Sequence, residues 1–183
     1  MLIAIGIIAA LVLALLGYAT TRPNHFRVER SLNIRASSER VFALINDFQT
    51  WRSWSPYEKL DPAMKKTYTG PQSRRGAVYA WDGNSKAGAG RMEIANSVPN
   101  SKVTIKLDFT RPFEGHNTAE FTLQPNGGTT KVTWALYGPQ NFMMKVMSIF
   151  MNMDRMVGKD FDEGLANLKA QAEVEPKSTT AAL

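Results

Sequence analysis

The side chains best suited to chemistry lie in one short segment, Arg111 to His116, which reads RPFEGH. An imidazole exchanges protons near neutral pH, so His116 has the chemistry of a general acid or base. Pro112 and Gly115 are turn-forming residues, which predicts a hairpin turn with solvated side chains. The alternative is that Glu114 and His116 lie at the mouth of a cavity and bind the polar end of a ligand.

No other segment has the composition of a catalytic site. The chain has no cysteine, which excludes thiolate metal sites and cysteine nucleophiles, and its two histidines are far apart in sequence. The glycine-rich stretch 86–90 lacks the spacing of a phosphate-binding loop. We therefore predict no catalytic residue, no metal and no cofactor. The acidic residues near the C-terminus are predicted to be surface charges: Asp160, Asp162 and Glu163.

The apolar residues indicate a different kind of site. The run Phe142 to Met156 contains six of the nine methionines, and on a helix it is apolar on more than one side. Its extra apolar flanks could pack on the aromatics of the segment 51–62 as ordinary core, roof a cavity, or form a dimer or membrane contact. The residues predicted to line a cavity are Trp51, Trp54, Tyr57, Tyr79, Trp81, Phe109, Phe113, Phe121, Trp134, Met143, Met147, Phe150 and Met151.

The first segment is an uncharged apolar run, Leu2 to Ala19. Its length suffices to span a bilayer, which needs roughly 20 residues and tolerates about 17. The alternative is a cleaved signal peptide, because Gly17-Tyr18-Ala19 has the small-x-small form of a cleavage site. A signal peptide usually has a basic start, and no Lys or Arg precedes this run. We therefore prefer an uncleaved anchor.

Flanking charge gives an expectation for sidedness. Arg22, Arg27, Arg30 and Arg35 all follow the span, which by the positive-inside rule predicts a single-pass protein with its domain on the cytoplasmic side. Cleavage would instead give a periplasmic or secreted protein. The net charge of +6 suits an anionic membrane surface, and without a Lys/Arg cluster with interleaved aromatics we predict no nucleic-acid binding.

The rest of the chain has the pattern of one α+β domain. Phe26 to Ile34 alternates as a strand, with Arg30 the misfit on its apolar face. Ser37 or Ser38 caps a short helix, about six strands follow in an antiparallel meander, and one long helix runs from after Pro139 to about Ala172. The predicted divisions are an anchor (1–20), a linker (21–25), the domain (26–173) and a disordered tail (174–183).

The order of segments resembles a known superfamily. The segments that carry the resemblance are FRVERSLNI, VFALINDF, WRSWSPYEKLDP, GAVYAWDGN, GRMEI, FEGHNTAEFTLQP, VTWALYGP and GKDFDEGLANLK, which together cover nearly all of residues 26–172. They are similar to the START/Bet v 1-like (SRPBCC) superfamily, in its polyketide cyclase/dehydrase and lipid-transport branch. The resemblance implies a helix-grip fold: a curved antiparallel sheet wrapped around a long C-terminal helix, with a cavity for hydrophobic ligands.

Fold resemblance leaves the function open, because one fold hosts many functions. Our first expectation is a membrane-anchored domain, held through residues 2–19, that binds a hydrophobic small molecule or lipid such as a quinone or a polyketide-like aromatic. The second is a cyclase or dehydrase acting on a polyketide-like substrate in the same cavity. The third is a protein-interaction module, with a weak homodimer through the Met-rich helix.

Overall fold

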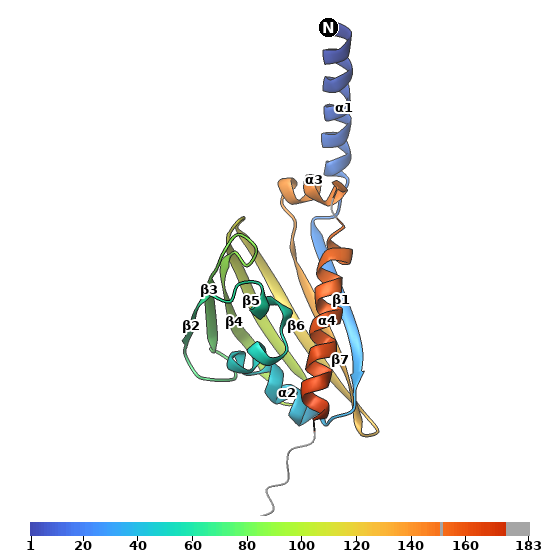
Figure 1. Ribbon diagram of the computed structural model, residues 1–183. Coiled ribbons are helices and arrows are strands. Elements are labelled where there is room, and N and C mark those ends of the chain that lie inside the picture. Colours follow the sequence, from blue (N-terminus) through green and yellow to red (C-terminus); the bar gives the residue numbers. More distant parts are fainter. Residues whose placement is uncertain (151, 175–183) are drawn as a thin grey trace, which may run out of the picture.

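The computed structural model describes residues 1–150 and 152–174 (Figure 1). An N-terminal helix stands apart from a domain built of a sheet and several helices. In chain order the elements are α1 (Leu2–Thr20), β1 (His25–Ile34), α2 (Ser38–Ile45), the 3-10 helices η1 (Phe48–Ser53) and η2 (Pro56–Lys59), β2 (Lys65–Thr69), β3 (Val78–Asp82), β4 (Ala89–Val98), β5 (Lys102–Arg111), β6 (Gly115–Asn126), β7 (Thr129–Pro139), α3 (Phe142–Phe150) and α4 (Met153–Glu173).

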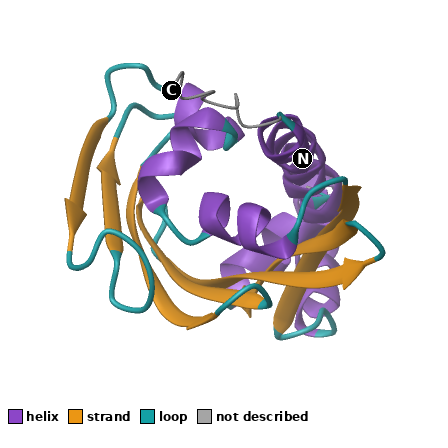
Figure 2. Ribbon diagram, turned by 90° about the horizontal axis from the view of Figure 1, so that it is seen from below, coloured by secondary structure: helices purple, strands orange, loops and turns teal. Residues whose placement is uncertain are grey.

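The strands form one antiparallel sheet of seven strands in the order β1-β7-β6-β5-β4-β3-β2. It curves around the domain's helices, which lie on its concave side (Figure 2). The side chains alternate between the two faces because successive residues of a strand point in opposite directions. Val28 of β1 lies opposite Leu136 of β7, and both point into the core. The predicted α+β helix-grip architecture is confirmed.

The C-terminal helix differs from our expectation. We predicted one continuous helix to about Ala172, and this was wrong, because the chain forms two helices, α3 and α4. Asn152 has an extended backbone and caps α4: its side chain accepts a hydrogen bond from the backbone N–H of Arg155 at 2.9 Å. Asparagine is among the preferred residues at this position, since its oxygen satisfies a backbone donor that a helix start leaves unpaired.

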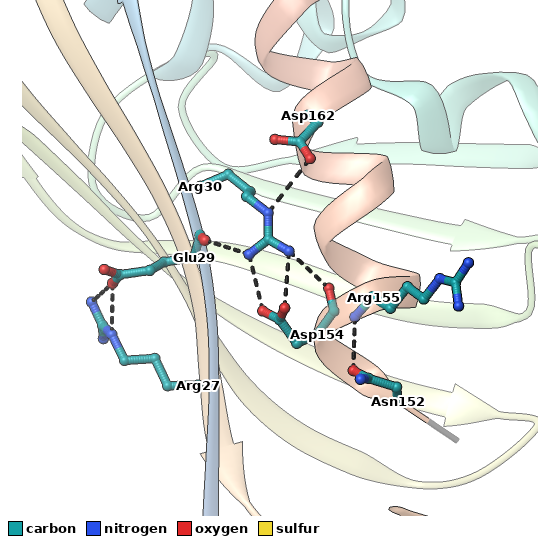
Figure 3. Close-up of polar contacts among 7 residues, drawn as sticks. All are labelled: Arg27, Glu29, Arg30, Asn152, Asp154, Arg155 and Asp162. Atoms are coloured by element: carbon teal, nitrogen blue, oxygen red, sulfur yellow. Dashed lines mark hydrogen bonds and ion pairs between the residues drawn. The ribbon is translucent and has the colours of Figure 1, made fainter. Parts of the chain in front are cut away.

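Arg30, the misfit on the apolar face of β1, joins that strand to α4 (Figure 3). Its guanidinium donates to both carboxylate oxygens of Asp154 at 2.9 and 3.0 Å and lies 3.5 Å from Asp162. The pair lowers the pKa of Asp154 through the hydrogen bond from Arg30. Gly158 provides the space, because a Cβ there would come within 2.0 Å of the guanidinium.

Helix α1 is long and apolar enough to cross a membrane. Only 6% of its most apolar stretch, Ile3 to Thr20, is buried. A signal sequence would pass the same test. The charges used to predict sidedness have other roles: Arg27 pairs with Glu29 at 2.8 Å, and Arg30 holds α4. Only Arg22 remains close to the span, so the cytoplasmic placement stays a prediction. The tail was predicted to begin at Val174, and its residues after Val174 lie outside the described part of the chain.

Candidate functional site

Aromatic rings fill the middle of the space between sheet and α4. Trp134 of β7 stacks on Phe161 of α4 with ring centroids 4.0 Å apart, and on Phe121 of β6 at 4.9 Å. Trp51 and Trp54 complete the cluster, with their centroids 4.8 Å apart. All five side chains are buried. We call these five residues the closed end of the grip, because they pack against one another and are all buried.

One polar atom in this cluster is unsatisfied. The indole N–H of Trp134 has no hydrogen-bond partner among the residues that the structure describes. A buried donor without a partner costs about 1–3 kcal/mol, and such groups are rare in folded proteins. A water or a polar ligand atom would satisfy it.

The opposite end of the concave face is apolar but only partly covered. Trp81 of β3, Leu107 of β5 and Val157 of α4 pack against the buried core, yet each keeps part of its surface exposed. Phe109 of β5 is also partly exposed and lies against Trp81. The rings of Trp81 and Phe109 meet edge to face, 5.6 Å apart. Gly90 makes this arrangement possible, because a Cβ there would lie 2.5 Å from the Trp81 ring. We call Trp81, Leu107, Phe109 and Val157 the open end.

Strand register places the open end near α1 and α3. Trp81 lies opposite Gly90, Gly90 opposite Phe109, and Phe109 opposite the first residue of β6. At the same end of the strands lie the start of β1, which follows α1, and the end of β7, which leads into α3. In Figure 1 these strand ends point toward α3 and the foot of α1. A ligand at the open end would therefore lie close to any membrane that contains α1.

Tyr57 and Asp160 form a polar pair beside the closed end. Tyr57 of η2 approaches Trp134 edge to face, with ring centroids 6.3 Å apart. Burial, and then the neighbouring Asp160, raises the pKa of Tyr57. Burial also raises the pKa of Asp160, and the charge of Glu163 adds to that effect. We had predicted a surface charge at Asp160, but its side chain is half-buried and interacts with the phenol of Tyr57.

A second polar contact lies inside the fold at Tyr79. Its hydroxyl donates to Glu58 at 2.8 Å, and Lys66 pairs with the same carboxylate. Burial, and then Glu58, raises the pKa of Tyr79. Because Glu58 is already paired with both groups, we assign this contact to the support of η2 on β2 and β3.

The residues predicted for the cavity mouth lie beside the turn between β5 and β6. His116 pairs with Asp108, the neighbour of Phe109, so it points to the face of the sheet opposite to that of Phe109. His116 Nδ1 is 2.7 Å from Asp108, and this contact raises the pKa of His116. Glu114 lies 3.4 Å from the other ring nitrogen. With Met144 and four further residues, Glu114 and His116 line an open hollow of about 220 Å³. That is below the roughly 300–1,000 Å³ of a typical small-molecule pocket.

The remaining predicted lining residues are spread over the molecule. Met143, Met147 and Phe150 lie in α3, which packs against α1. Phe113 is 68% exposed in the turn between β5 and β6. Met151 lies outside the described residues. A further shallow hollow, of about 170 Å³, lies between η1 and the start of β3 and includes none of the predicted residues.

Comparison with known proteins agrees with the fold. Residues 25–173 match the family model for polyketide cyclase / dehydrase and lipid transport. The chain belongs to this family. The match spans every element of the domain from β1 to α4 and leaves out α1. No curated protein matches the chain.

Proteins of known structure share the fold at low sequence identity. Protein CV1439 from Chromobacterium violaceum is 16% identical, with a TM-score of 0.58 over 84% of this chain and 100% of that one. The Aha1 dimer from Colwellia psychrerythraea is 15% identical, with a TM-score of 0.56 over 81% and 97%. The di-domain ARO/CYC BexL from the BE-7585A biosynthetic pathway is 12% identical, with a TM-score of 0.60 over 86% and 53%.

Sequence reasoning missed Asp160, although its position carried a signal. It follows the apolar Val157 by three residues and precedes the buried Gly164 by four, so it lies at the rim of the buried stripe of α4. The hydrogen-bonding state of Trp134 had no such signal, because it depends on where one ring lies among residues from four elements.

Proposed function

We propose that this family member binds a hydrophobic small molecule or lipid at the open end of the grip, while α1 anchors the domain in a membrane. The observation that carries the proposal is the partly exposed apolar surface of Trp81, Leu107, Phe109 and Val157 on the concave face. Burying such surface is worth about 25 cal/mol per Å². The family description, which includes lipid transport, supports this chemistry.

The position of the open end supports a membrane as the source of the ligand. It lies at the edge of the sheet that joins α1 and α3, so a lipid-soluble molecule would have a short path from the bilayer to the concave face. Tyr57 and Asp160 would orient the polar end of the ligand, since a few polar groups in an apolar site usually fix orientation.

Native mass spectrometry of the full chain, extracted with its lipids in nanodiscs, tests this proposal. We expect an extra mass that denaturation releases as a lipid, quinone or aromatic molecule. Trp81→Ala should lose that mass, whereas Val98→Ala, an exposed apolar residue at the other end of β4, should keep it. A bare chain that also fails to bind a fluorescent apolar probe would contradict the proposal and favour a protein-interaction module.

A second candidate is a cyclase or dehydrase, and the Tyr57–Asp160 pair favours it. A carboxylate with a raised pKa is a suitable general base, and it could remove a proton from a carbon next to a ketone of a polyketide-like substrate. The structural similarity to BexL, an ARO/CYC protein, is consistent with this chemistry. Turnover of a model poly-β-ketone that Asp160→Asn abolishes without loss of binding would establish the enzyme. Binding without turnover would favour the ligand-binding function over the enzyme.

A further inference from the structure

The Met-rich helix α3 has an unusual position. It lies crosswise at the foot of α1 and apart from α4 (Figure 1), and residues of α1 and α3 contact one another. None of its side chains is fully buried. A nine-residue helix with this composition in a soluble domain would be expected to bury its apolar face against the core.

The apolar face of α3 points away from the domain. Phe142, Met143 and Phe150 are 49%, 63% and 71% exposed, and at about 100° per residue they fall within one arc of about 100°. Outside this arc Lys145 donates to Asn24 at 2.6 Å, and Met144 faces the hollow beside His116. The polar side of the helix is therefore attached to the domain, and the apolar side is presented outward.

We propose that this face of α3 lies in the headgroup region of the same membrane that holds α1, with the helix axis parallel to the surface. The occupant is lipid because α3 contacts α1, so the exposed apolar residues of α3 lie next to a helix whose own surface is apolar and exposed. Helices of this kind lie in the membrane interface with their apolar residues about 5–10 Å below the headgroups. Arg22 and Arg155, close to the two helices in sequence, add positive charge that suits anionic lipids.

This inference rests on the proposed insertion of α1, and it gives the open end a fixed orientation. Two contacts with the membrane, α1 across it and α3 along it, would prevent the domain from rotating freely on its anchor. The edge of the sheet that holds Trp81 and Phe109 would then face the headgroups. A ligand would pass between bilayer and grip without crossing bulk water.

The lack of cysteine in the chain makes the test direct. Single cysteines are introduced by Met143→Cys and Phe150→Cys, with Leu11→Cys as the control in α1 and Gln171→Cys at the far end of α4. The full chain carrying one nitroxide label is placed in vesicles of phosphatidylcholine with phosphatidylglycerol. The accessibility of each label to oxygen, which enters lipid, and to a water-soluble nickel complex is then measured by electron paramagnetic resonance.

We expect the labels at 143 and 150 to be several-fold less accessible to nickel than the label at 171, and more accessible to oxygen. If the label at 11 is accessible to oxygen and those at 143 and 150 are accessible to nickel, this inference is overturned, and the proposed insertion of α1 still holds. A label at 11 that is accessible to nickel would overturn both the insertion of α1 and the position of α3 on the membrane. Protection of 143 and 150 from both reagents, with spin–spin broadening that dilution removes, would assign the face to a second copy of the chain instead.

Discussion

The two ends of the grip use the same residue types with opposite results. At the closed end Trp134 lies between Phe161 and Phe121 and is buried. At the open end Trp81 and Phe109 meet edge to face and stay partly exposed. The difference lies in what covers them: η1, η2 and α4 pack around the first group, while α3 packs against α1. Covered aromatics stabilise the fold, and uncovered ones are available to a ligand.

The largest expected effect is at the closed end. Phe161→Ala removes a fully buried ring from the stack on Trp134, and such changes cost about 3–5 kcal/mol because a cavity remains. Urea denaturation of the full chain in detergent, followed by far-UV circular dichroism, measures the loss. Phe113→Ala, at an exposed position, should stay within about 0.5 kcal/mol of the parent. Equal losses for the two variants would remove the contrast on which the closed end is defined.

The next effect tests how α4 is held on the sheet. Gly158→Ala would normally favour a helix, but here the added methyl group would displace Arg30 from its carboxylates. We expect a loss of about 1–3 kcal/mol from overpacking. In an Arg30→Ala background the same change should become neutral or stabilising, which a double-mutant cycle measures. A stabilising effect of Gly158→Ala in the parent chain would mean that the Arg30 side chain moves aside at little cost.

The open end should show the reverse pattern. We expect Trp81→Ala to weaken binding of a fluorescent apolar probe about tenfold, which corresponds to about 1.4 kcal/mol. Its effect on unfolding should be smaller than that of Phe161→Ala, since the ring is only partly buried. Titration of the full chain in lipid nanodiscs with the probe, and with Val98→Ala as control, separates the two quantities. Unchanged probe binding by Trp81→Ala would contradict the assignment of the open end as a ligand site.

The smallest effect concerns pH. The folded state raises the pKa of Asp160, so its charged form costs stability above the ordinary carboxyl pKa, and the cost disappears as pH falls below that value. Asp160→Asn should therefore stabilise the chain at pH 7, by less than about 1 kcal/mol because the group is partly exposed, and change nothing near pH 3. Equal denaturation midpoints of variant and parent at both pH values would mean that the group is fully solvated.

Much of the fold was predictable because its signals are local. Alternation along β1 and β5 and the turn Asn126-Gly127-Gly128 fix strands and hairpins from neighbouring residues alone. The position of the strand β2 was missed, since KKTYT is exposed throughout and shows no apolar alternation. The break at Asn152 was missed because an apolar run continues on both sides of it. An asparagine followed by Asp154 was nevertheless the signature of a new helix start.

The candidate site was less predictable because it depends on what lies across from each side chain. The sequence placed Trp51 and Trp81 in one set, and only the packing of η1, η2 and α4 separates them into buried and partly exposed groups. The methionines of the run 142–156 suggested a cavity roof, but the break places Met143 and Met147 in α3, which contacts α1. Arg30 stood out as a misfit on the apolar face of β1, but only the structure shows that it pairs with Asp154 and Asp162 of α4.

Photolabelling tests the central claim most directly. A fatty acid carrying a diazirine in its chain is added to the full protein in nanodiscs, irradiated, and located by peptide mass mapping. Labels on α1 and α3 are expected from lipid contact alone and decide nothing. The proposal predicts additional labels on the peptides of Trp81 and Phe109, competed by excess unlabelled lipid, and none at Phe121 or Ile105. Labels confined to α1 and α3 would contradict it.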